Sequence, residues 1–267
     1  PSPLDLPLVD GATEPMSTPR TAIPEVEHLD ADVVGRLLQR RHPDAEVHDV
    51  EVLEVAELTN THVRLRIHYA HRAGAPEHLF VKLPPRDPSR RRQIAATAMG
   101  PKEVHFYEQL AGRTSLRTPE VHGTALDEAT GDFVLALEDL QSSGCRIPDG
   151  TVGVAPDAAA RALEELAAFH AAHAHPGTPG GQAATDWITP AGPGSDYAVG
   201  MLRHGIEHHR DRLSDTFVHI AELYGAHRLE MQALWHPRPW TVVHGDPHLG
   251  NVFDDHGRVG FLDWGIV

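Results

Sequence analysis

The sequence has 267 residues, of which 40% are hydrophobic and 23% are charged, and its formal net charge at pH 7 is −15. This composition is typical of a soluble globular protein long enough for two lobes, and it argues against a fibrous or fully disordered chain. The acidic balance argues against a nucleic-acid partner, because phosphate contacts need clustered cations. The single cysteine, Cys145, excludes an intramolecular disulfide and a multi-cysteine zinc site, which fits a reducing cytosol.

Residues 1–27 are predicted to form a disordered or loosely packed tail. Prolines and acidic residues stand where a signal peptide has a basic start and an apolar run, and the stretch does not begin with Met, so we expect the true start upstream. No stretch approaches the roughly 20 apolar residues that span a bilayer. The sequence therefore predicts a cytoplasmic protein without a membrane partner.

A β-rich half follows the tail. Helical spacing predicts a helix over residues 30–42. Alternation of apolar and polar residues predicts a half-buried antiparallel strand over 61–69, with neighbouring strands over 47–58 and 77–85. The stretch RDPSRRR, residues 86–92, is interpreted as a basic loop.

A helix is then predicted to begin at Pro101, where proline is favoured as a first helical residue. Its spacing of i, i+3, i+4 and i+7 places Glu103 on the same face as Phe106, Tyr107 and Leu110. Two more strands are predicted over the following segments, residues 119–126 and 131–140.

The second half is Ala-rich and helical. Helices are predicted over 157–173, 197–213 and 215–234, with a long Pro/Gly loop over 176–196. Three short strands, 241–243, 251–253 and 259–262, close the sequence. The predicted fold class is α+β: a β-rich N-lobe at 28–137 that binds the nucleotide, a hinge at 138–140, and a mainly helical C-lobe at 141–267.

The last 27 residues contain a spacing that points to phosphoryl transfer. This reaction needs a carboxylate near the attacking hydroxyl and oxygen ligands for Mg²⁺, and Asp246, Asn251 and Asp263 offer both. Asn251 follows Asp246 by five residues, and a hairpin returns the chain to Asp263. The spacing matches the established protein-kinase template, from which these roles are taken.

The same template predicts the nucleotide contacts upstream. Lys82 ends the third strand, where a phosphate-pairing lysine is expected, and Glu103 on the next helix is its expected ion-pair partner. The hinge residues Glu138, Asp139 and Leu140 are expected to read the edge of adenine with backbone groups.

The sequence resembles the aminoglycoside phosphotransferase family, including its ecdysteroid kinase-like and choline kinase-like branches. The resemblance is carried by HGDPHLGN, FLDWG, KEVHFYEQL, LALEDL and LAAFHAAH, and runs over residues 50–265. It implies a two-lobed protein-kinase-like fold, with Asp246 as catalytic base and Asn251 and Asp263 as Mg²⁺ ligands. It also implies that His244 braces the catalytic loop and that His248 replaces a phosphate-facing lysine, as in small-molecule kinases.

Two features depart from that family. The phosphate-covering loop AELTNTHV has no glycine, so Asn60 and Thr61 are expected to supply donors to the nucleotide instead. The family's C-lobe continues past the Asp-x-Gly segment, so the ending at Val267 predicts a truncated C-lobe.

The predicted function is transfer of the γ-phosphate of ATP, or alternatively GTP, with Mg²⁺ to a hydroxyl of a small molecule. An aminoglycoside or other antibiotic, a sugar, an amino alcohol and a sterol-like alcohol all fit as acceptor, and the protein is expected to be a monomer or homodimer. One alternative is a nucleotide-binding pseudokinase or an inactive truncated copy. Another is a His-rich metal-binding protein, given the 21 histidines.

Several residues have a structural and a functional interpretation. Asp254 and Asp255 are interpreted as turn formers rather than catalytic acids. His204 and His208 have the i, i+4 spacing of a Zn²⁺ pair, but a surface helix is favoured, as it is for HAAHAH at 170–175. His170 is expected to pack beneath the catalytic loop, and Trp187 either stacks on a substrate or packs in its loop.

Overall fold

A computed structural model describes residues 23–174, 187–188, 196–235 and 240–267. Most of the predicted tail and of the predicted 176–196 loop lies outside these residues. In the described ranges, no helix combines the length and the apolar character needed to cross a membrane. The chain divides into two compact units, one of Pro1–Ala96 with His122–Ala136 and one of Thr97–Val121 with Leu137–Val267. Each unit is described by itself.

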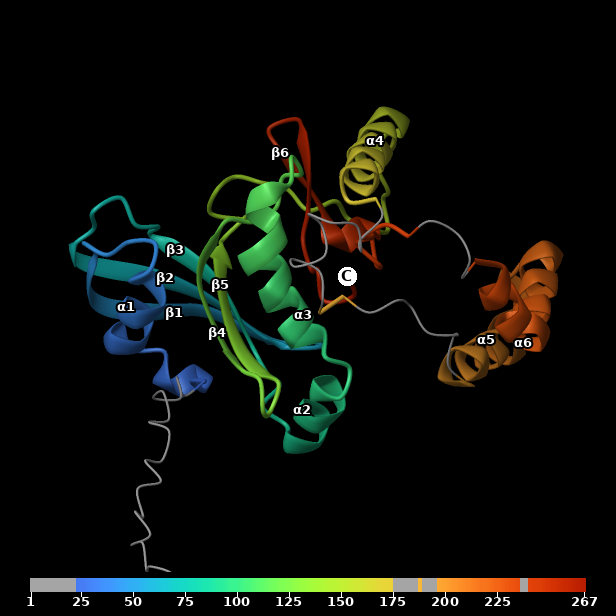
Figure 1. Cartoon of the computed structure of the whole chain (residues 1–267), viewed down its shortest axis with the longest axis horizontal. Helices are drawn as coiled ribbons and strands as arrows, with labels where there is room; N and C mark the ends of the chain where they lie inside the picture. Colours follow the sequence, from blue (N-terminus) through green and yellow to red (C-terminus); the bar gives the residue numbers. More distant parts are fainter. Residues whose placement is uncertain (1–22, 175–186, 189–195, 236–239) are drawn as a thin grey trace, which may run out of the picture. The chain divides into compact units, whose positions relative to one another are not determined.

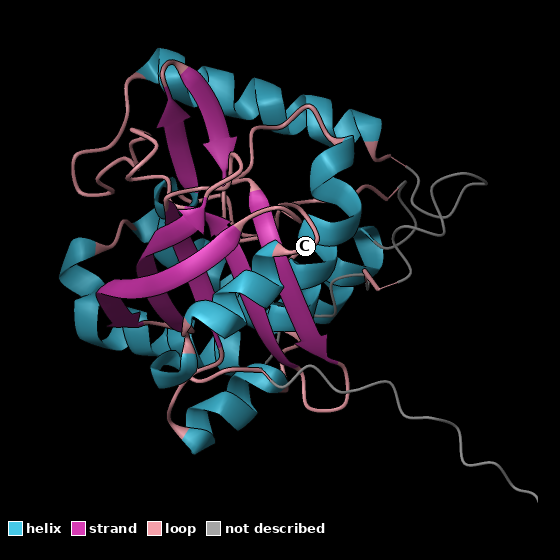
Figure 2. Cartoon of the chain, turned by 90° about the vertical axis from the view of Figure 1, so that its left-hand side faces the viewer, coloured by secondary structure: helices cyan, strands magenta, loops and turns pink. Residues whose placement is uncertain are grey.

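The first unit is built on a five-stranded sheet, shown in magenta in Figure 2. Its strand order is β1-β2-β3-β5-β4, and β2 runs antiparallel to both β1 and β3. The elements are α1 (Ala31–Leu38), β1 (Glu46–Glu57), β2 (Thr61–His71), β3 (His78–Leu83), α2 (Pro88–Ala95), β4 (Val121–Asp127) and β5 (Asp132–Glu138). The sequence predicted all five strands, and the α+β class is confirmed.

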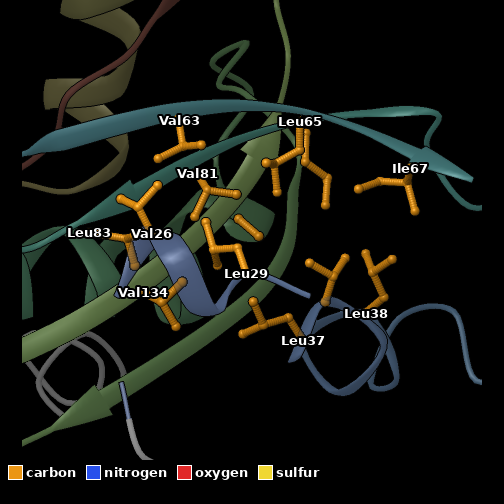
Figure 3. Close-up of a cluster of buried hydrophobic side chains, with 13 residues drawn as sticks. Val26, Leu29, Leu37, Leu38, Val63, Leu65, Ile67, Val81, Leu83 and Val134 are labelled. Atoms are coloured by element: carbon orange, nitrogen blue, oxygen red, sulfur yellow. The ribbon is translucent and has the colours of Figure 1, made fainter. Parts of the chain in front are cut away.

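One face of this sheet packs on helix α1. Val63, Leu65 and Ile67, every second residue of β2, point to that face (Figure 3). Leu37 and Leu38 of the helix pack against it. Each of these side chains is buried, which stabilises the unit by roughly 1.5–3 kcal/mol per side chain. The apolar residues of the alternating pattern in the sequence therefore form the buried face of this sheet.

The stretch predicted as a basic loop, residues 86–92, lies largely in helix α2, so the prediction of a loop was wrong. The side chain of Asp87 accepts a hydrogen bond from the amide of Arg90 at 2.8 Å, and Pro88 occupies the first turn. No residue of α2 is buried, so the helix lacks the apolar stripe that would have revealed it. Arg91 attaches it to the sheet by two hydrogen bonds to Asp132, at 2.8 and 2.9 Å.

The second unit contains four α-helices and one hairpin among its described residues (Figure 1). They are α3 (Met99–His105), α4 (Pro156–Ala172), α5 (Asp196–His209), α6 (Asp215–Trp235), β6 (Val252–Asp255) and β7 (Arg258–Phe261). Helix α3 continues as a π-helical turn, Phe106–Leu110, a form often found at functional sites. Helices α5 and α6 lie against each other. Residues 241–243 are not a strand, because only Thr241 forms an isolated bridge, to Ala174.

The hairpin of β6 and β7 closes through a two-residue turn. His256 and Gly257 both have positive φ, 51° and 95°, which suits the twist of such hairpins. Asp254 accepts a hydrogen bond from the amide of Gly257 at 3.1 Å and is a turn former, as predicted. Gly260 has no room for a side chain, since a Cβ there would lie 2.2 Å from the ring of Phe253.

Candidate active site

His244 joins the two segments of the second unit that are predicted to carry the catalytic and metal-binding residues. Its ring is buried, Nε2 donates to the carbonyl of Leu262 at 2.9 Å, and Nδ1 accepts from the amide of Asp246 at 3.3 Å. These partners require the neutral ring, and burial lowers the pKa of His244. The predicted catalytic loop is therefore connected through His244 to Leu262, the residue that precedes Asp263.

Asn251 closes the loop that starts at Asp246. Its side-chain Nδ2 donates to the carbonyl of Asp246 at 3.0 Å, and its own carbonyl accepts from the amide of Leu262 at 3.0 Å. Asn251 is buried, so this orientation is held by the surrounding protein. Because Nδ2 donates to Asp246, the amide orientation is defined, and Oδ1 is the atom of this side chain that can accept or coordinate.

Asp263 has a strained backbone, with φ at 65°. Such a conformation costs about 1–3 kcal/mol and persists only where neighbouring structure enforces it. The neighbour is Trp264, which is fully buried and stacks on Phe106 at 3.9 Å between ring centroids, with Phe169 and His244 against it at 5.2 and 4.4 Å. Sequence reasoning missed this aromatic cluster, although the Trp in FLDWG was its signal.

Asp246 and His248 form the accessible part of the loop. Nδ1 of His248 accepts from the amide of Gly250 at 3.0 Å, so Nε2 is the other ring position and lies 3.6 Å from a carboxylate oxygen of Asp246. Gly250 permits this ring position, because a Cβ there would lie 2.8 Å from His248 Cε1. The side chains of Asp246 and His248 are 47% and 60% exposed, so a substrate can reach both.

The predicted hinge uses its acidic side chains internally. Asp139 is buried and accepts from the amide of Gln141 at 3.2 Å and from the hydroxyl of Ser142 at 2.7 Å. Glu138 accepts from Arg117 at 2.8 Å. Within the described ranges, no residue accepts a hydrogen bond from the amide of Leu140. Backbone groups, not carboxylates, are thus what this segment offers to a ligand.

Glu103 lies on the buried face of α3, as its spacing predicts. One turn later, the hydroxyl of Tyr107 is buried and has no hydrogen-bond partner among the described residues. Burial raises the pKa of Tyr107 well above its ordinary value, and the charges of Glu103 and Asp263 raise it further. The hydroxyl therefore stays protonated close to both carboxylates.

Three predicted nucleotide contacts belong to the first unit. Lys82 is buried on β3, opposite His62 of β2. The hydroxyl of Thr61 lies 3.0 Å from the carbonyl of Pro84 and 3.0 Å from a carboxylate oxygen of Glu57, so it is already engaged. Asn60 precedes it, and its side-chain Oδ1 is buried without a hydrogen-bond partner in the described part of the chain. The pairing of Lys82 with Glu103 stays a prediction.

The remaining candidate residues have structural positions. No group of three or more His, Cys, Asp or Glu in the described ranges is arranged to hold a metal, and the rings of His204 and His208 simply stack at 4.1 Å. His175 lies outside those ranges. The carbonyl of His170 accepts from the hydroxyl of Thr241 at 2.6 Å, and the indole of Trp187 donates to Gln109 at 3.0 Å.

A cavity of about 600 Å³ lies in the second unit between α4 and the hairpin. Its lining is mainly apolar and includes Pro247 and Leu249, which flank His248. None of the predicted site residues lines it. The cavity therefore borders the predicted catalytic loop without including a predicted site residue.

Comparison with known proteins gives one family. A model described as "Phosphotransferase enzyme family" matches residues 62–267, whereas no curated protein sequence matches the chain. Solved structures with some likeness include a GDP complex of a mutant aminoglycoside 2'-phosphotransferase, at 17% identity and a TM-score of 0.48, covering 88% of this chain and 72% of that one. Another is a choline/ethanolamine kinase family protein from Mesorhizobium loti, at 19% identity and a TM-score of 0.38, covering 81% of this chain and 58% of that one.

Proposed function

The chain belongs to the phosphotransferase enzyme family, and on that premise we propose that it transfers the γ-phosphate of ATP to a hydroxyl group of a small molecule. The observation that carries the proposal is the hydrogen-bonded frame around His244 and Asn251. This frame fixes Asp246 and the residue before Asp263 to each other within the second unit. A kinase needs a base and its metal ligands in such a fixed relation, because phosphoryl transfer depends mainly on positioning and electrostatics.

Asp246 is the proposed general base. It accepts the proton of the attacking hydroxyl while an oxygen–phosphorus bond forms to the γ-phosphorus and the bond to the bridging oxygen of ADP breaks. Its exposed carboxylate suits this role. His248 lies beside it, and Nε2 when protonated is a donor for the oxygens of the transferred group.

Asn251 and Asp263 are the proposed ligands of Mg²⁺. The donor set fits this ion, which prefers hard oxygen ligands, because the Asn251 amide is turned so that Oδ1 remains available and Asp263 supplies a carboxylate. When bound, Mg²⁺ would neutralise charge on the phosphate oxygens.

Lys82 is the proposed cation for the phosphates, with Glu103 as its partner, and the backbone of residues 138–140 is proposed to read the base. The amide of Leu140 supports this last role. The engaged hydroxyl of Thr61 leaves backbone groups of Asn60 and Thr61 as the donors for the nucleotide in that loop.

The first test is thermal stabilisation by ATP, measured with Mg²⁺ and with EDTA, and repeated with GTP. ATP consumption is then measured across aminoglycosides, sugars, amino alcohols and sterol-like alcohols. We expect Asp246→Ala to abolish turnover and retain nucleotide binding, whereas Asp263→Ala also weakens binding in the presence of Mg²⁺. Asp211→Asn, an exposed aspartate remote in sequence from the site, is the control and should behave as wild type.

The outcomes separate the alternatives. No stabilisation by either nucleotide would contradict the kinase proposal. Nucleotide binding without turnover of any acceptor would instead favour a pseudokinase or an inactive copy. Equal loss of nucleotide binding in Asp246→Ala and Asp263→Ala would show that the two roles are assigned wrongly.

A further inference from the structure

We propose that Arg117 is a positioning residue for the nucleotide, because it holds residues 138–140 in a fixed relation to the hairpin that connects Asn251 with Asp263. The inference rests on the proposed function and adds to it a residue that touches neither substrate nor metal. Arg117 lies just before β4, in a segment where no sequence motif marks a role.

The guanidinium of Arg117 binds two carboxylates from different parts of the second unit. Nε donates to Asp255 of the hairpin at 2.6 Å, and Nη2 donates to Glu138 at 2.8 Å. Nη1 donates to the carbonyl of Thr118, and the guanidinium lies 5.2 Å from the ring centroid of Phe253. The planar fork of arginine can serve these partners together, which the single ammonium of a lysine cannot.

Both ends of this connection are held by further hydrogen bonds. Glu138 also accepts from the amide of Glu120 at 3.1 Å, and its own amide donates to the carbonyl of Glu120 at 2.7 Å. At the other end, the carbonyl of Arg117 accepts from the amide of Phe261 in β7 at 2.8 Å. Arg117 is therefore fixed to the hairpin by its backbone as well as by its side chain.

The ion pairs are largely shielded from water. The side chains of Arg117, Glu138 and Asp255 are 16%, 15% and 25% exposed. Burial opposes ionisation of Glu138, but hydrogen bonds from Arg117 and from the Glu120 amide hold its pKa below the ordinary value. Removing one partner thus leaves a charge that is poorly solvated, and the segment carrying it is expected to move.

The position of this connection explains why it matters for a nucleotide. Glu138 is two residues from Leu140, whose amide is the proposed base contact, while β6 and β7 lead directly from Asn251 and to Asp263. A nucleotide spans base and phosphates in one molecule. Arg117 therefore sets the separation between the groups that bind its two ends.

The experiment compares ligands that do and do not use the base contact. Binding of Mg·ATP and of Mg·tripolyphosphate is measured by calorimetry for wild type, Arg117→Lys and Glu138→Gln. We expect each variant to weaken the binding of Mg·ATP about tenfold and to change the binding of Mg·tripolyphosphate less than twofold. The KM for ATP should rise by a larger factor than kcat falls. Equal weakening of both ligands, or no change in either, would overturn the proposal.

Arg258→Lys is the matched control, because Arg258 of the same hairpin donates to the carbonyl of Ser115 at 2.7 Å without contacting residues 138–140. It should bind both ligands as wild type does. If Arg117→Lys loses its folded circular dichroism spectrum, Glu138→Gln decides, since it keeps the shape of the side chain and leaves Arg117 with Asp255. Wild type that binds no nucleotide would instead contradict the proposed function.

Discussion

Replacing Gly245 by Ala tests whether the proposed catalytic loop is confined by the segment after Asp263. Gly245 has φ of 87°, and a Cβ there would lie 2.5 Å from the carbonyl oxygen of Ile266. The left-handed conformation costs about 1–2 kcal/mol for a residue with a Cβ. The contact adds roughly 1–3 kcal/mol of overpacking, so we expect Gly245→Ala to lower the free energy of unfolding by about 2–5 kcal/mol.

Gly257→Ala isolates the backbone contribution. Gly257 has φ of 95° in the hairpin turn, and a Cβ there would meet no atom within 4 Å. Gly257→Ala is therefore expected to lower the free energy of unfolding by only about 1–2 kcal/mol. Urea titration with a common slope measures both losses, and activity should fall in Gly245→Ala alone, because Asp246 is the next residue. Equal losses of stability in the two variants would refute the steric reasoning.

Three further predictions follow from buried groups. Tyr107→Phe removes a buried hydroxyl that has no hydrogen-bond partner among the described residues. It should therefore raise the free energy of unfolding, measured by urea titration, by about 1–3 kcal/mol. A lower free energy of unfolding would mean that the hydroxyl does have a hydrogen-bond partner. Burial lowers the pKa of His244, so His244 in the unfolded chain binds a proton before it does in the folded chain as pH falls below about 6.5, and the free energy of unfolding decreases. Between pH 7.5 and 5.5, the melting temperature of His244→Gln should therefore fall less than that of wild type. The control His219→Gln, at an exposed histidine, should match wild type. Trp264→Ala should lower the free energy of unfolding by about 3–5 kcal/mol and weaken Mg²⁺-dependent nucleotide binding. Trp264→Phe keeps a ring against Phe106 and should retain most of that binding.

Elements with a buried face could be predicted from the sequence, because burial imposes a period. The strand β2 shows a period of two, and α3 shows a helical period that correctly places Glu103 inside. Helix α2 was missed because it buries no residue, so only its Asp87 cap and Pro88 marked it. Residues 241–243 were wrongly predicted as a strand, because an apolar run does not reveal whether a partner strand exists.

The candidate site divides in the same way. Asp246, Asn251 and Asp263 could be selected from the sequence because they lie within one short segment at a known spacing. Arg117 could not, because its partners Glu138 and Asp255 lie 21 and 138 residues away and no local pattern connects them. The use of the Glu138 and Asp139 side chains inside the protein was equally invisible, since it depends on which neighbours the fold brings to them.

The long separation between Arg117 and Asp255 has a consequence for synthesis on the ribosome. The core cluster of the first unit draws its buried residues from Val26 to Ala136, so they are all translated before the hairpin exists. Residues 97–121 interrupt that unit, yet Phe106 and Arg117 must wait for Trp264 and Asp255. The nascent chain is thus expected to display the apolar face of α3 until the hairpin and Trp264 have been translated, which makes this helix a segment where a chaperone would bind and where slow translation would favour aggregation.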